Sequence, residues 1–102
     1  MVHPSRKPRR TTEEVENTVK LVSELCTKRG VDRHRARTLM SMVRWIGRKK
    51  TPPTMGELQK RFGYWAPNSL VPFLMHEGVL KTSDAMRDYK PVMEVDYGKE
   101  EG

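Results

Sequence analysis

The chain has 102 residues, with 20 Lys and Arg against 13 Asp and Glu, which gives a net charge of +7. This length suits one small domain with tails and excludes two domains. No run of about 18 apolar residues is present, which excludes a membrane span, and the basic amino terminus lacks the apolar stretch of a secretory signal. A single cysteine, Cys26, excludes an intramolecular disulfide framework. We therefore expect a reducing, cytoplasmic compartment and not a secreted protein.

The positive charge is concentrated in two segments. Residues 1–10 carry +4 and residues 31–50 carry +6, whereas residues 51–80 are neutral. This distribution favours a polyanion as the partner, and an ordinary solvated basic surface is the alternative.

Residues 1–11 show no periodicity and are expected to form a disordered basic arm. The sequence Thr11-Thr12-Glu13-Glu14 predicts a capping box. Apolar residues then recur at spacings of three and four, which predicts an extra amino-terminal helix over 12–29 that ends at Gly30. This helix either completes the core or pairs with a second copy. We predict a homodimer interface formed by Val15, Val19, Val22 and Leu25.

Asp32 is expected to cap a second helix, which runs to Lys50. Its basic residues fall on one face at about 100° per residue, and this face either contacts phosphates or is simply solvated. Trp45 lies off the apolar arc of the helix, so we expect it to contact the amino-terminal helix or a partner chain. The residues of the basic face are Arg33, Arg37, Arg44 and Arg48.

A helix-turn-helix unit is predicted over residues 51–78. Thr51-Pro52-Pro53 ends the second helix, and Thr54 is expected to cap a helix that stops at Gly63. Residues 64–67 predict a turn, followed by a short helix to about Glu77. Because proline is harmless only in the first three helical positions, Pro72 predicts that this helix is capped by Ser69.

Residues 79–97 predict a β-wing, with strands over 79–82 and 89–97 around a polar loop at 83–88. The expected apolar face of the second strand consists of Tyr89, Pro91, Met93, Val95 and Tyr97. Residues 98–102 are expected to be a frayed tail. The predicted fold is therefore mostly α with a small β-hairpin, in one domain over residues 12–97.

Several short motifs follow one another between residues 51 and 80: Pro52-Pro53-Thr54, Glu57-Leu58, Arg61-Phe62-Gly63, Pro67-Asn68-Ser69 and Gly78-Val79-Leu80. With them, roughly residues 32–82 resemble the winged-helix DNA-binding domain of the LexA repressor family. The resemblance implies a winged helix-turn-helix whose last helix enters the major groove, with Asn68 and Ser69 at its groove-facing start. The chain departs from the family in its extra amino-terminal helix and in having no room for a protease domain, so no Ser–Lys chemistry is carried over.

Two sets of DNA-contacting residues are predicted. Amide, hydroxyl, phenol and indole groups are expected to reach bases or the adjoining backbone; equally, Asn68 and Ser69 are common caps and Trp65 is suited to covering the core. The first set is Tyr64, Trp65, Asn68 and Ser69. The second set, expected at phosphates or the minor groove, is Arg6, Lys7, Arg9, Arg10, Arg33, Arg37, Arg44, Arg48, Lys49, Lys50, Arg61, Lys81, Arg87 and Lys90.

The sequence favours a binding protein over an enzyme. His3, His34 and His76 lie far apart without ligand spacing, so no metal is expected, and no cofactor or catalytic motif is present. The predicted function is a small double-stranded-DNA-binding protein, a transcriptional repressor or accessory factor, with neither a membrane nor a small-molecule substrate as partner. RNA is disfavoured because interleaved aromatic residues are absent. The alternative is a winged-helix protein-interaction adaptor that docks through exposed Leu70, Val71 and Phe73.

Overall fold

A computed structural model of the chain describes residues 12–87 and 90–96, and it describes only the backbone of residues 84–87 and 90. The predicted basic arm with Thr11, the tyrosines Tyr89 and Tyr97, and the predicted tail lie outside the described residues. The described part is mostly helical with one small antiparallel sheet, as the sequence predicts. In chain order the elements are α1 (Thr12–Arg29), α2 (Arg33–Arg48), α3 (Met55–Phe62), α4 (Trp65–His76), β1 (Leu80–Arg87) and β2 (Lys90–Val95).

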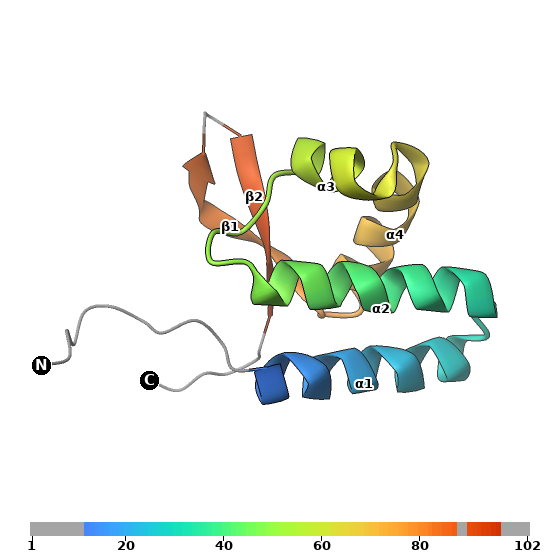
Figure 1. The fold of residues 1–102 in the computed structure, drawn as a ribbon. Coiled ribbons are helices and arrows are strands. Elements are labelled where there is room, and N and C mark those ends of the chain that lie inside the picture. The colour runs from blue at the N-terminus through green and yellow to red at the C-terminus, as the bar shows by residue number, and fades with distance from the viewer. Residues whose placement is uncertain (1–11, 88–89, 97–102) are drawn as a thin grey trace, which may run out of the picture.

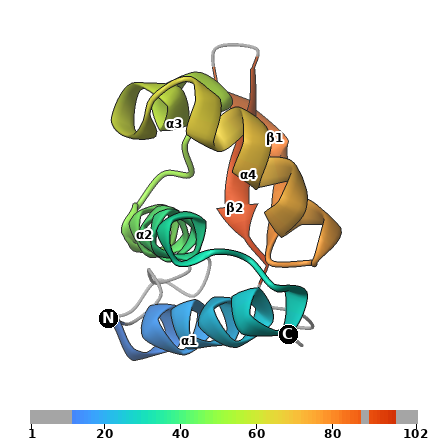
Figure 2. The same ribbon diagram turned by 90° about the vertical axis from the view of Figure 1, so that its right-hand side faces the viewer.

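α2 lies at the centre of this arrangement. Figures 1 and 2 show α1 beside α2 and running in the opposite direction, while α3, α4 and the hairpin lie on the other side of α2. Because neighbours cover it on two sides, its apolar arc is broader than the stripe of a helix at the surface. Its buried residues, Leu39, Met42, Val43 and Ile46, are at most 3% exposed.

α1 has the bounds that the sequence predicts, and α2 begins where predicted but ends at Arg48, two residues before the predicted Lys50. Gly30 follows α1 with a φ of 69°, and the amide of Val31 donates to the carbonyl of Cys26 at 2.9 Å. This is the hydrogen bond of a Schellman motif, which requires the left-handed backbone that glycine adopts most easily. Asp32 then caps α2 by accepting a hydrogen bond from the Arg35 amide at 2.8 Å.

α3 begins with a complete capping box. The Thr54 hydroxyl accepts from the Glu57 amide at 3.3 Å, and the Glu57 carboxylate accepts from the Thr54 amide at 3.1 Å. The helix ends at Gly63, where the sequence predicts its end. The two bonds satisfy amide groups that a helix start otherwise leaves without partners, which explains how a helix of 8 residues holds a defined start.

The predicted start of the last helix is wrong. α4 begins at Trp65, so residues 64–67 form its entry and first turn, and Ser69 lies inside the helix. Pro67 occupies the third helical position, where no intrahelical hydrogen bond needs its missing N–H. Pro72 lies in the middle of the helix, past its first turn. α4 has 12 residues, whereas the sequence predicts a helix of barely two turns.

The first strand of the hairpin is longer than predicted. Residues 83–87, expected in a polar loop, belong to β1, which pairs with β2 from Leu80↔Val95 to Arg87↔Lys90 around an irregularity between Thr82 and Met86. Antiparallel pairing provides hydrogen-bond partners for the backbone N–H and C=O groups whatever the polarity of the side chains. The polar composition of residues 83–87 therefore does not end the strand.

The predicted apolar face of β2 is correct only in part. Met93 and Val95 are buried as expected, whereas Pro91 is exposed and Val92 is buried. The chain just before α3 runs along this strand: Val92 forms a bridge with Thr54, and the Met93 amide donates to the Pro53 carbonyl at 2.8 Å. This contact attaches the hairpin to the start of α3.

We expect Leu74→Ala to lower the free energy of unfolding by about 2–5 kcal/mol, because Leu74 is 0% exposed in the core. The matched control is Leu21→Ala, the same chemical change at a residue of α1 that is 62% exposed; its expected effect is below about 0.5 kcal/mol. Urea unfolding followed by circular dichroism measures both values. Equal losses in the two variants would contradict the core described here.

Candidate nucleic-acid interface

α4 presents one side to solvent along its whole length. Its opposite side is buried and includes Leu70, Val71 and Leu74. The docking patch predicted from Leu70, Val71 and Phe73 is therefore wrong, because the first two residues lie in the core and Phe73 is half-buried. The exposed residues recur at spacings of one, three and four and share one face: Trp65, Asn68, Ser69, Pro72, Met75 and His76.

Asn68 is held in place by α3. The side-chain amide of Gln59 donates to the Asn68 carbonyl oxygen at 2.9 Å, which leaves the Asn68 NH₂ group as a donor toward solvent. An amide fixed in this way loses less side-chain entropy on binding than a free one. No sequence pattern predicts the role of Gln59, because its contact depends on how the two helices cross.

Two aromatic side chains lie at the entry to α4. Trp65 is 79% exposed and Tyr64 is 59% exposed. Their ring centroids are 5.1 Å apart and the ring planes are nearly perpendicular. The alternative that Trp65 covers the core is therefore wrong, since most of the indole is in contact with water.

Trp45 contacts α3, a neighbour other than the amino-terminal helix or the partner chain that the sequence predicts. Its ring meets the edge of Phe62 at a centroid distance of 5.7 Å. The Lys49 ammonium lies 4.5 Å from the centre of the indole, and the Arg61 guanidinium lies 5.9 Å from it. This cation–π arrangement holds two predicted phosphate-binding residues against one ring. The sequence could not show it, because Trp45 and Arg61 come from different helices.

The four arginines expected to form one phosphate-facing stripe have different surroundings. Arg44 donates to the Glu16 carboxylate of α1 at 2.7 and 2.9 Å, and Arg48 reaches the same carboxylate at 3.4 Å. These two residues therefore join α1 to α2. Arg33 and Arg37 are exposed and make no ion pair within the described part of the chain. Helical spacing puts them on the same side of α2 as Arg44, which is the side toward α1.

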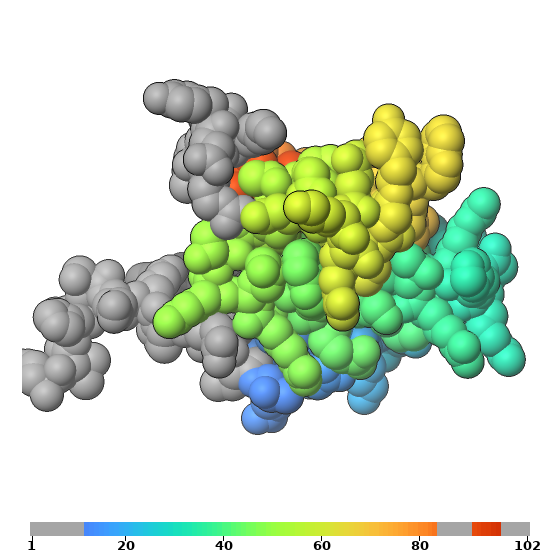
Figure 3. Space-filling model, turned by 45° about the horizontal axis from the view of Figure 1, so that its top comes forward, coloured from blue at the N-terminus to red at the C-terminus, as the bar shows by residue number. Residues whose placement is uncertain are grey.

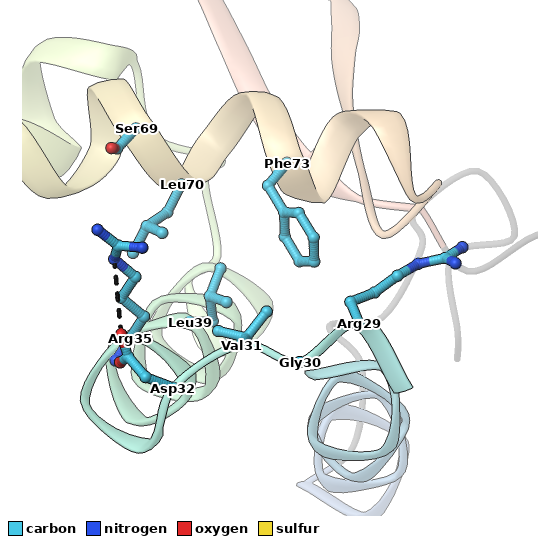
Figure 4. Close-up of a pocket in the computed structure, with 9 residues that line it drawn as sticks. All are labelled: Arg29, Gly30, Val31, Asp32, Arg35, Leu39, Ser69, Leu70 and Phe73. Carbon is cyan, nitrogen blue, oxygen red and sulfur yellow. Dashed lines mark hydrogen bonds and ion pairs between the residues drawn. The ribbon is translucent and has the colours of Figure 1, made fainter. Parts of the chain in front are cut away.

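Arg35, which is outside the predicted basic face of α2, faces α4 instead. Figure 4 shows its side chain beside Ser69, across a groove of about 430 Å³ between the start of α2 and α4. An ion pair with Asp32 at 4.0 Å holds it only loosely, since both side chains are more than half exposed. At the other end of this groove Arg29 of α1 is bound to Glu77, with a shortest distance of 3.0 Å. The apolar floor is formed by Val31, Leu39, Leu70 and Phe73.

The other predicted phosphate-binding residues are dispersed. Lys50 is exposed after α2, and Lys81 on β1 is exposed and lies 4.0 Å from Glu94. Only the backbone of Arg87 and Lys90 is described, and it pairs at the end of the hairpin. The arm residues Arg6, Lys7, Arg9 and Arg10 lie outside the described part of the chain.

The predicted dimer interface is part of the chain's own core. Val15, Val19 and Val22 are at most 4% exposed, and Leu25 is half-buried. Of the two roles considered for these side chains, completing the core is the one the structure supports. A second copy could reach the three valines only if α1 separated from its neighbours in the core.

The burial of Cys26 raises the pKa of its thiol, so the neutral thiol prevails at neutral pH and the residue is a poor nucleophile. Within residues 12–87 and 90–96, no group of three or more His, Cys, Asp or Glu side chains is placed to hold a metal ion. Nor does any helix in these ranges have the length and apolar composition needed to cross a bilayer.

The exposed groups of α3, of α4 and of the start of α2 lie on one face of the molecule (Figure 3). The face combines amide and hydroxyl groups, two aromatic rings and several cations. No Asp or Glu occurs between Glu57 and Glu77 in the sequence. Comparison of the chain with models of protein families, with curated proteins and with solved structures found no match.

We expect the contribution of Glu16 to stability to disappear in acid. The hydrogen bond from Arg44 lowers the pKa of Glu16, so the folded state is stabilised above the unfolded pKa and loses this stabilisation as the pH falls through the folded pKa. The difference in Tm between the wild type and Glu16→Gln should be largest at neutral pH and shrink between about pH 5 and pH 2. Glu24→Gln, at an exposed residue of α1 without an ion pair in the described part of the chain, is the control and should show no such trend.

Proposed function

We propose that the chain binds double-stranded DNA by placing the first half of α4 in the major groove. The observation that carries this proposal is the exposed face of α4, where Asn68 and Ser69 point to solvent, Arg35 of α2 lines the same groove as Ser69, and residues 58–76 contain no Asp or Glu. The order of the elements, with α2, α3 and α4 followed by a hairpin, supports a winged helix-turn-helix. Such a small DNA-binding protein would act as a transcriptional repressor or accessory factor.

The affinity would come mainly from cations that flank α4. Arg35 lies beside Ser69, and Lys60 and Arg61 are exposed in the last turn of α3, just before α4 begins. Lysine and arginine side chains that neutralise phosphates release counterions, which makes the affinity depend steeply on salt. Arg44 and Arg48 contribute less to the affinity in this proposal, because both are already ion-paired with Glu16.

Sequence readout would fall to the side chains of α4. An asparagine amide pairs with the major-groove edge of adenine, where it needs both its oxygen and its nitrogen. Asn68 is already hydrogen-bonded through its oxygen to Gln59, so it offers a base one firmly placed donor. Readout by this face would therefore be modest, and phosphate contacts would account for most of the affinity.

We expect Arg35→Ala and Arg61→Ala each to lower the slope of log affinity against log salt concentration by about one. Fluorescence anisotropy of a labelled duplex at several salt concentrations measures this slope. The control is Lys20→Ala, which removes the same charge from an exposed position of α1 and should leave the slope unchanged. No binding to any duplex at about 50 mM salt, or the same slope for all variants, would exclude the proposal.

We expect Asn68→Ala to change sequence preference and to leave the salt slope unchanged, because it removes a base contact and no charge. Selection of bound duplexes from a random pool, repeated with the variant, should show relaxed preference at one base pair. The loss of discrimination at that position should be about 1–3 kcal/mol at most. An unchanged selected sequence would remove Asn68 from the readout.

A further inference from the structure

The aromatic pair Tyr64 and Trp65 is not explained by groove binding. Both rings lie at the surface, with 79% of Trp65 and 59% of Tyr64 exposed. Among the described residues, the other large apolar side chains that are exposed are Leu21 and Met75. The two rings are nearly perpendicular, so the phenol can meet at most one face of the indole and the other face is free of it. Because the Trp65 indole is exposed to water, it has no role in the core. It can therefore contact a ligand without lowering the stability of the fold.

The surroundings of the pair favour a nucleic acid as its ligand. In the sequence the rings come between Lys60 and Arg61, which are exposed in the last turn of α3, and the exposed Asn68 of α4. Residues 58–76 contain no Asp or Glu. Aromatic rings that follow exposed cations in the sequence, with no carboxylate in the same segment, suit a base attached to a phosphate backbone. An acidic protein partner would satisfy the cations but would leave the ring faces without a matching group.

An intact duplex gives these rings little to bind. In the major groove the bases present only their edges, and an indole offers a single N–H donor and no acceptor. A ring face gains most by stacking on the face of a base, which is accessible only when the base has left the helical stack. The same position at the start of α4 would place the rings at the base pairs while the flanking cations hold the backbone.

We infer that Tyr64 and Trp65 stack on an unpaired base, and that the preferred ligand is duplex DNA interrupted by an extrahelical nucleotide. This inference rests on the proposed DNA binding and adds the kind of DNA that is preferred. Trp65 supplies the stacking face, and Tyr64 holds the indole through the edge-to-face contact. Arg61 and Lys60 neutralise the phosphates next to the unpaired base.

Three labelled probes of one sequence test this inference: a perfect duplex, the same duplex with one bulged adenosine, and the same duplex with a bulged abasic site. The abasic probe keeps the bend of a bulge but has no base to stack. We expect the bulged adenosine to be bound at least about fivefold more tightly than either other probe, the lower end of what one aromatic–base stack contributes. Quenching of tryptophan fluorescence should accompany the adenosine probe alone.

Variants assign the effect to the ring. Trp65→Ala should lower the affinity for the bulged adenosine to that for the abasic probe, so that the preference disappears. Trp65→Phe should keep part of the preference and lose the quenching, because Trp45 then provides the remaining fluorescence. Leu21→Ala removes another exposed apolar side chain, on α1, and should behave as the wild type.

The outcomes separate this inference from the proposed function. Equal affinity for all three probes would overturn stacking and leave duplex binding intact. Tight binding of both bulged probes would show a preference for bent DNA and would also overturn it. If no probe were bound, the proposed function would fail and the inference with it.

Discussion

Two-sided burial of α2 is the constraint on which the rest of the structure depends. A chain of 102 residues has little apolar surface to bury, and α2 is the helix that α1 and the hairpin both contact. Its side chains Met42 and Val43 are adjacent in sequence, point in different directions, and are both fully buried. α1 is therefore part of the core, and α4, on the other side of α2, keeps one side exposed along its length.

The helices that the sequence predicts correctly begin or end at strong local signals. Asp32, the Thr54–Glu57 capping box and Gly30 each act within one turn, and their hydrogen bonds are present. α4 lacks such a signal at its start, since Tyr64 makes no capping hydrogen bond through its side chain. The prolines of α4 predict a later start. Pro67 instead fits the first turn, and the packing of α4 against the core keeps Pro72 in the middle of the helix. The strand residues 83–87 were missed for a related reason, because strand pairing does not require an apolar pattern.

The candidate site is harder to predict than the fold, because its contacts join different elements. Helical periodicity correctly relates Arg44 to Arg48, but it does not show that Glu16 of α1 lies opposite them. The same periodicity puts Arg35 on the other side of α2 from Arg33 and Arg37, and only the packing of α4 makes that side part of the candidate interface. The Gln59–Asn68 hydrogen bond and the contact of Arg61 with Trp45 also join residues of different helices, so helical periodicity does not predict them. Residue types at this surface could be predicted, but not which of them lie together.

The position of Cys26 between α1 and α2 gives the protein an internal reporter of its own opening. It is the single cysteine of the chain and is 2% exposed, so a thiol reagent reaches it only when this part of the core opens. The rate of alkylation under native conditions would therefore measure how often α1 detaches, without any introduced label. Under the proposed function, slower alkylation in the presence of DNA would mean that a ligand on α4 reduces the opening of the core on the opposite side of α2.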